Sequence, residues 1–204
     1  SSELQKGKAK IVKELVQQAI DQGIDPKVIL NDGLLAGMSI IGEKFKKDEV
    51  FVPEVLVAAR AMNAGIAILE PKLIEVGNKA VGKVVIGTVK GDLHDIGKNL
   101  VIMMLKGAGF EIIDLGIDVE AEEFVNKAEE VGADFICMSA LLTTTMNNMK
   151  EIIDILNERG LRDKYIVMVG GAPLSETFAK QIGADYYAED ATTAAEIAKK
   201  AISA

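Results

Sequence analysis

Apolar residues in the first part of this chain recur with the period of an α-helix. Up to about residue 76 they follow a spacing of three and four residues, and the pairs Asp25-Pro26 and Pro53-Glu54 carry residue types that begin helices. We expect a bundle of three or four amphipathic helices, the last of which bends or stops at Pro71. Alanines and glycines at several helical positions would let these helices approach closely.

From residue 83 the pattern changes to short β-branched runs that alternate with helical stretches. The runs are continuous, which is typical of strands buried on both faces of a parallel sheet. The sequence therefore predicts an α/β fold, a doubly wound parallel sheet of five strands that is Rossmann-like and flavodoxin-like. The expected strands contain Val84–Ile86, Ile112–Ile113, Phe135–Ile136, Tyr165–Val169 and Tyr186–Tyr187.

Two glycines and an asparagine interrupt both patterns between residues 76 and 82. We expect a helical domain over 1–78, an α/β domain over 82–204 and a linker over 77–82. The predicted fold class is therefore an N-terminal helical bundle followed by the sheet.

Composition narrows the function classes. A formal net charge of −8 disfavours a nucleic-acid partner, because such proteins gather Lys and Arg on one face. The single cysteine, Cys137, lies in an apolar stretch and can form no intrachain disulfide, which fits a reducing cytoplasm. The start of the chain lacks an apolar signal core, and no run of about 18 consecutive apolar residues follows, so we expect neither secretion nor a membrane partner.

The only histidine, His94, lies between the first expected strand and the helix after it. Open α/β sheets bind ligands at such strand-to-helix loops, and an Asp two residues earlier, Asp92, can fix the tautomer of the imidazole. Metal ligation is thus one interpretation of His94. The simpler alternative is that it caps the helix or pairs with a carboxylate.

Other ligands fit this loop poorly. It lacks the glycine spacing of dinucleotide and nucleoside triphosphate sites, and Asp92 and Asp95 would repel a phosphate, including that of a flavin mononucleotide. A receiver domain needs an Asp where the third strand ends in Ser139. One His and one Cys cannot form a structural zinc site, and no Cys-x-x-Cys-His haem signature is present. His94 can supply one axial ligand to a metal held by a macrocycle.

Three spaced motifs resemble those of cobalamin-binding domains. Asp92-Leu93-His94-Asp95-Ile96-Gly97 matches the Asp-x-His-x-x-Gly pattern, Ser139-Ala140-Leu141 matches Ser-x-Leu, and Gly170-Gly171 matches a Gly-Gly pair. The helical half resembles the cap domain of the same family. The chain is thus similar to the cobalamin-binding module of methionine synthase and to the corrinoid proteins of anaerobic methyltransferase systems.

The resemblance implies a base-off cobamide with His94 on cobalt, a relay of His94, Asp92 and Thr145, and a channel for the nucleotide tail. It further implies that Phe45, Val52 and Val55 form an apolar lid over the upper face. Asp92→Asn is expected to leave the fold and cofactor binding largely intact and to shift the cobalt(II)/cobalt(I) potential. The implied cofactor-binding residues are Gly91, Asp92, Leu93, His94, Asp95, Ile96, Gly97, Ser139, Leu141, Thr143, Thr145, Gly170, Gly171, Phe45, Val52 and Val55.

The function implied by the resemblance is that of a methyl-carrier subunit that is not catalytic alone and cycles between methylcob(III)alamin and cob(I)alamin. A substrate-specific methyltransferase would load it, a second would pass the methyl group to tetrahydrofolate or a thiol, and a reductive activation protein would repair it. The donor could be methanol, a methylamine, a methylthiol or a methoxylated aromatic, the last favoured by similarity to bacterial folate-linked members. The alternatives are a cobalamin-dependent sensor or regulator and the B12-binding subunit of a radical mutase.

Overall fold

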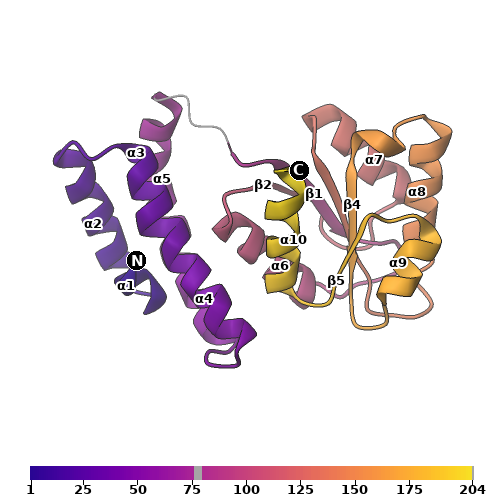
Figure 1. Ribbon diagram of the computed structural model, residues 1–204, viewed down its shortest axis with the longest axis horizontal. Coiled ribbons are helices and arrows are strands. Elements are labelled where there is room, and N and C mark those ends of the chain that lie inside the picture. The colour runs from indigo at the N-terminus through magenta and orange to yellow at the C-terminus, as the bar shows by residue number, and fades with distance from the viewer. Residues whose placement is uncertain (76–79, 204) are drawn as a thin grey trace. The chain divides into compact units, whose positions relative to one another are not determined.

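The computed structural model describes residues 1–75 and 80–203. These residues form two compact units, a helical unit over Ser1–Ala80 and an α/β unit that contains Val81–Lys106 and Phe110–Ala204 (Figure 1). Residues 77–79 of the expected linker lie outside the described residues.

The helical unit begins with a helix of four residues and ends with its longest helix. Asp25 caps α3 by accepting a hydrogen bond from Lys27 N–H at 2.8 Å, and Pro26 occupies the first helical position, as the sequence predicts. The elements are α1 (Ser2–Gln5), α2 (Ala9–Asp21), α3 (Pro26–Val28), the π-helical η1 (Ile29–Leu35), α4 (Ala36–Lys46) and α5 (Val52–Glu75).

Helix α5 does not stop at Pro71. The sequence predicts a bend or a stop at this proline, and the stop does not occur. The helix continues to Glu75 with the proline inside. Pro71 cannot donate to the carbonyl one turn earlier, but Leu69 and Leu73 on either side of it are buried, and their packing maintains the helix.

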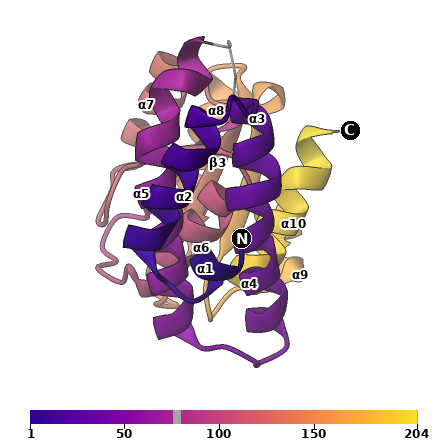
Figure 2. The same ribbon diagram turned by 90° about the vertical axis from the view of Figure 1, so that its left-hand side faces the viewer.

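Small residues allow close packing in the helical unit. A Cβ atom on Gly65 of α5 would lie only 2.9 Å from Leu34 Cδ2 and 3.0 Å from Val12 Cγ1, and α2 packs along α5 (Figure 2). Over Val52–Leu73, α5 is long and apolar enough to cross a membrane by length and composition. Its buried residues Val55, Met62 and Leu69 identify it as the core helix of this unit.

The α/β unit is a parallel sheet in the order β2-β1-β3-β4-β5, which confirms the predicted fold class. All four strand pairs are parallel, and the order is that of flavodoxin-like folds. The strands are β1 (Lys83–Thr88), β2 (Glu111–Asp114), β3 (Phe135–Ser139), β4 (Ile166–Gly170) and β5 (Tyr186–Ala188). The helices are α6 (Ile96–Gly107), α7 (Ala121–Val131), α8 (Asn148–Glu158), α9 (Glu176–Ile182) and α10 (Ala191–Ile202), with a 3₁₀ turn η2 (Arg162–Lys164).

Helices cover both faces of the sheet, which explains the continuous apolar runs of its strands. α7, α8 and α9 pack on one face through residues such as Phe124, Ile152 and Ile182, and α6 and α10 lie on the other (Figure 1). Phe110 precedes β2 and meets the ring of Phe135 edge-on, with ring centroids 5.7 Å apart. Both faces of the sheet are therefore core.

The connections reverse direction between β1 and β3. The chain passes from β1 to β2 on one side and from β3 to β4 on the other, so the loops after β1 and β3 diverge at the carboxyl edge of the sheet. This switch point is the usual ligand position in open α/β sheets. His94 follows β1 and Leu141 follows β3, so both lie there.

Candidate functional site

A fully buried carboxylate, Asp92, organises the two loops at the switch point. Its Oδ1 lies 2.7 Å from His94 Nδ1 and accepts the His94 N–H at 3.1 Å. Its Oδ2 accepts the N–H groups of Leu141 and Leu142 at 2.8 and 3.1 Å and the Thr145 hydroxyl at 2.7 Å. Asp92 therefore joins the loop after β1 to the loop after β3, residues about fifty positions apart in the chain.

These bonds keep Asp92 ionised. Burial alone would raise the pKa of the Asp92 carboxyl, but the hydrogen bonds from Leu141, Thr145 and His94 outweigh it and hold that pKa well below the ordinary value of 3.8. An ionised carboxylate can only accept, so Nδ1 of His94 must carry the proton that points at it. In the neutral imidazole the lone pair is then on Nε2, which makes Nε2 the atom that can bind a metal.

Nε2 is the remaining polar atom of His94. The N–H and Nδ1 of the residue are bound to Asp92, and its C=O accepts the Thr88 hydroxyl at 2.9 Å. The imidazole side chain is 50% exposed, although the carboxylate that holds it is fully buried. The arrangement presents one oriented nitrogen ligand on an otherwise engaged residue.

Exposed apolar side chains accompany the histidine. Leu93 and Ile96 flank it with exposed fractions of 66% and 74%, and Leu141 and Leu142, which bind Asp92 through their N–H groups, are 44% and 40% exposed. A flat macrocycle with a central metal needs such an apolar surface around one axial ligand. Among residues 1–75 and 80–203, no three His, Cys, Asp or Glu side chains gather as a metal cluster. The residues present therefore fit a corrin, and His94 is the side chain here that could ligate its metal.

Thr143 and Thr145, both candidates from the sequence, differ in their surroundings. Thr145 is 6% exposed and donates to Asp92, and its hydroxyl also lies 3.0 Å from Leu142 O. Thr143 is exposed, and no hydrogen bond joins it to this network in the described part of the chain. The contacts of the predicted relay thus exist between His94, Asp92 and Thr145.

The glycine pair after β4 has a steric role. Gly171 has a φ of +140°, and a Cβ there would lie 1.8 Å from Ala140 O, far closer than van der Waals contact with that backbone oxygen allows. Gly170 O accepts the Ala140 N–H at 3.3 Å, beside the partly buried Ser139. Close approach of the two strand ends accounts for Gly171, and a channel for a nucleotide tail beside it stays a prediction.

The remaining predicted site residues occupy simple environments. Gly91 adopts a φ of +78°, which favours glycine, and Asp95 O and Oδ2 accept bonds from Asn99 at the start of α6. A Cβ on Gly97 would meet open space. In the helical unit, Phe45 and Val52 are half-buried and Val55 is fully buried. Their lid role stays a prediction.

Several residues that support the site were missed by sequence reasoning. The fully buried Thr88 holds the His94 carbonyl, and Asp118, at a φ of +55°, accepts Gly91 N–H at 2.7 Å and donates its own N–H to Asp92 O at 3.0 Å. Lys98, only 3% exposed, places Nζ 2.7 Å from Asp114 Oδ1, which ties α6 to the end of β2. Asp118 and Lys98 contact residues 27 and 16 positions away in the chain, and Thr88 contacts one six positions away; no local motif marks any of the three.

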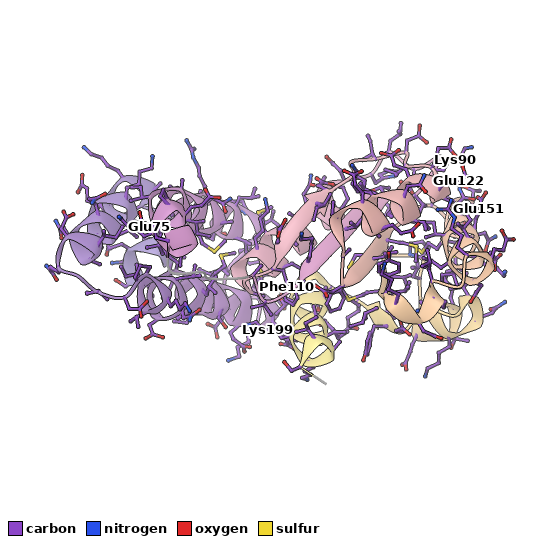
Figure 3. All side chains as sticks on the ribbon, turned by 90° about the horizontal axis from the view of Figure 1, so that it is seen from above. Glu75, Lys90, Phe110, Glu122, Glu151 and Lys199 are labelled. Carbon is purple, nitrogen blue, oxygen red and sulfur yellow. The ribbon has the colours of Figure 1, made fainter. Side chains whose placement is uncertain are left out.

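Charges at this end of the unit are largely paired on the surface. Figure 3 labels Lys90, of the loop after β1, and Glu151 of α8, whose charge acts on Lys90. Lys90 Nζ lies 2.9 Å from Glu120 Oε2, and this hydrogen bond is the main cause of the raised pKa of Lys90. In the core of the sheet, burial raises the pKa of the Cys137 thiol to about 12, so the thiol is inert as predicted.

Family models match both units. A B12 binding domain model matches residues 82–198, which contain the whole Asp92 network, and a second model with the same description matches residues 2–70. The chain belongs to the B12-binding family. Cobalamin or a related corrinoid is therefore the cofactor, and the resemblance read from the three motifs is confirmed.

Curated relatives of this B12-binding protein are corrinoid proteins. It is 49% identical over 197 residues to a corrinoid protein of Desulfitobacterium hafniense. The aligned residues cover 95% of this chain and 91% of that relative. It is also 49% identical over 178 residues to a dimethylamine corrinoid protein of Methanosarcina barkeri. Here the aligned residues cover 87% of this chain and 84% of the relative.

Solved structures of cobalamin-binding proteins have the same fold as this chain. A chain of the methanol:cobalamin methyltransferase complex of Methanosarcina barkeri matches 98% of this B12-binding protein at a TM-score of 0.88 and 34% identity, with 76% of that chain covered. A cobalamin-binding protein from Desulfitobacterium hafniense matches 97% at a TM-score of 0.79 and 31% identity, with 94% covered. The protein is thus a corrinoid protein of the kind found in methyltransferase systems.

Proposed function

We propose that this protein carries a methyl group on a corrinoid bound base-off, with His94 Nε2 as the lower ligand of cobalt. One observation supports this most: every polar atom of His94 except Nε2 is engaged, and the half-exposed imidazole lies among exposed apolar side chains. When bound, the corrinoid supplies the cobalt that accepts a methyl group from one partner and yields it to another.

The residues beneath the cofactor hold a proton in place. Asp92 accepts a hydrogen bond from the Nδ1–H of His94, which keeps the Nε2 lone pair available as a donor to a metal. Thr145 and the N–H groups of Leu141 and Leu142 hold the carboxylate in place beside the imidazole. These residues would therefore present Nε2 to a bound corrinoid in one tautomer and one orientation.

The helical unit is proposed to act as a lid. Phe45, Val52 and Val55 would cover the upper face of the corrin and exclude water from it. A methyltransferase could reach the cofactor only after the lid moves, with the linker 77–82 as the hinge. This division into a domain over 1–78 and a domain over 82–204 follows the change of hydropathy period and the separate family models.

The proposed partners are a donor-specific methyltransferase, an acceptor methyltransferase that uses a thiol or tetrahydrofolate, and a protein that reductively reactivates the cofactor. We propose a methylated amine as the donor. The relatives named for dimethylamine and trimethylamine are 49% and 46% identical, against 34% for the structure from a methanol system. These names favour an amine over the methoxylated aromatic expected from the sequence, and a carrier over a sensor or a mutase subunit.

Anaerobic reconstitution tests the ligand. The protein is loaded with cobalamin, reduced to the cobalt(II) state and examined by electron paramagnetic resonance. A base-off signal with nitrogen splitting from one axial imidazole is expected, and it should disappear in His94→Ala. Thr177→Val, at an exposed position on α9 outside the Asp92 network, is the control and should keep the splitting. Splitting that survives in His94→Ala would show that another group ligates the metal.

The donor is tested separately. The loaded, reduced protein is mixed with methyltransferases for mono-, di- and trimethylamine, for quaternary methylammonium compounds, for methanol and for methoxylated aromatics, and methylation of the corrinoid is followed by its visible spectrum. One amine class should react at least about tenfold faster than methanol, which corresponds to about 1.4 kcal/mol. Reaction with methanol or a methoxylated aromatic alone would contradict the amine assignment and leave the carrier role intact.

A further inference from the structure

A buried threonine, Thr88, ends strand β1 and is fully inaccessible to solvent. Its main chain is fixed on both sides, because Thr88 N–H donates to Gly116 O at 3.0 Å and its C=O accepts Val119 N–H at 3.0 Å. Valine has the same shape and would fill this position without burying a hydroxyl. The hydroxyl of Thr88 therefore calls for a specific partner.

That partner is the carbonyl oxygen of His94, 2.9 Å away. Helix α6 begins after this residue, and the helical hydrogen bond from Asn99 N–H goes to Asp95 O at 2.8 Å. The His94 carbonyl thus lies before the first hydrogen bond of the helix and accepts instead from the Thr88 hydroxyl at the end of β1. Asp92 fixes the imidazole and the N–H of the residue, and Thr88 fixes the opposite side of its main chain.

We propose that Thr88 is a positioning residue for His94: its hydroxyl anchors the main chain of the histidine to β1, so that Nε2 is presented to the corrinoid in one orientation. The inference rests on the proposed function, because it takes Nε2 as the cobalt ligand. A ligand held in advance loses less conformational freedom when it binds, so removal of the anchor weakens ligation without removal of the ligand.

Two pairs of variants isolate the hydroxyl. Thr88→Val removes it at constant shape, and its matched control is Thr192→Val, since the buried Thr192 has no hydrogen-bond partner for Oγ1 among the described residues. Thr88→Ala and Thr88→Ser differ from each other only in the hydroxyl and supply the same comparison should the valine variant not fold.

The readouts are cobalamin affinity and the fraction of nitrogen-split cobalt(II) signal at one fixed pH. Thr88→Val and Thr88→Ala should bind about five- to tenfold more weakly and show a smaller split fraction, as expected for the loss of one hydrogen bond. Thr88→Ser and Thr192→Val should resemble the parent protein. In a His94→Ala background, Thr88→Val should change affinity less than about twofold, because the group that it positions is absent.

Three outcomes overturn the inference, and they are distinguishable. An unchanged split fraction in Thr88→Val, or an equal loss of affinity in the His94→Ala background, would make Thr88 a packing residue only and leave the proposed function standing. Nitrogen splitting that persists in His94→Ala would instead refute the ligand itself, and the positioning role with it.

Discussion

At the scale of single residues, Asp92 shows how one side chain can serve structure and chemistry together. It accepts five hydrogen bonds while fully buried, two from His94 and three from the loop after β3. An amide in its place could not accept from all of these donors, because its nitrogen only donates. The structure therefore replaces the expectation that Asp92→Asn leaves the fold largely intact: we now expect it to loosen the two loops as well.

The buried hydroxyl of Thr145 gives a cleaner substitution. Thr145→Val keeps the shape and removes one donor from an ionised acceptor at 2.7 Å, so the free energy of unfolding should fall by about 1.5–3 kcal/mol. Thr143→Val, two residues away and exposed, should change it by no more than about 0.5 kcal/mol. Urea unfolding of the apoprotein measures both, and equal effects would contradict the role of Thr145 in the network.

Acid should weaken the fold through Asp92. Because the folded-state pKa of this carboxyl lies below its ordinary value of 3.8, its contribution to stability is complete above about pH 5 and is lost progressively as the pH falls below that and through the folded-state pKa. Asp92→Asn should remove this component, so its free energy of unfolding should depend less steeply on pH between about 5 and 3. Urea titrations of both apoproteins test this, and equal slopes would refute it.

Part of the site could be predicted from the sequence. The spacing of Asp92 and His94 puts a carboxylate beside the imidazole within one loop, and Thr145 followed from the family motif. Asp118 and Lys98 could not be predicted, because their partners are 27 and 16 residues away and meet them only in the folded sheet. The partner of Thr88 is only six residues away, but the loop conformation that brings the His94 carbonyl to its hydroxyl has no signal in the sequence.

At the scale of elements, the ends of β3 and β4 depend on one glycine. Gly171→Ala would place a Cβ 1.8 Å from a backbone oxygen that cannot move cheaply, and we expect a loss of stability on the order of 4 kcal/mol.

Gly160 provides the control, since it has a φ of +67° and a Cβ added there would meet no other atom within 4 Å. Gly160→Ala should cost about 1 kcal/mol from backbone conformation alone. Thermal unfolding of the apoproteins separates the steric from the conformational part, and similar costs at both positions would contradict the close approach.

The five strands are easier to predict from the sequence than the residues at which they begin and end. Continuous apolar runs locate all five strands, but β4 begins at Ile166, because its pairing with β3 begins there, opposite Phe135, and the expected Tyr165 lies outside it. The polar ends of β2, Glu111 and Asp114, carry no strand signal and join through pairing with β1. Pairing partners, which a single sequence does not reveal, set these limits.

At the scale of the whole molecule, transfer should require relative motion of the two units. A disulfide between one cysteine introduced in each unit is expected to abolish methyl transfer and to leave the corrinoid bound, and reduction should restore transfer. The native Cys137 is buried, with its thiol pKa raised to about 12, so it should not compete for the staple. Full activity in the oxidised form would refute the hinge.

The exposed edge of a single imidazole has a practical consequence for the study of this protein. The chain has one histidine, and its Nε2 is the nitrogen left accessible. An acylating reagent specific for imidazole would therefore modify the apoprotein once at that nitrogen, and bound corrinoid would block it. Intact-protein mass spectrometry would then count occupied molecules directly, on samples purified without a polyhistidine tag, whose imidazoles would react in the same way.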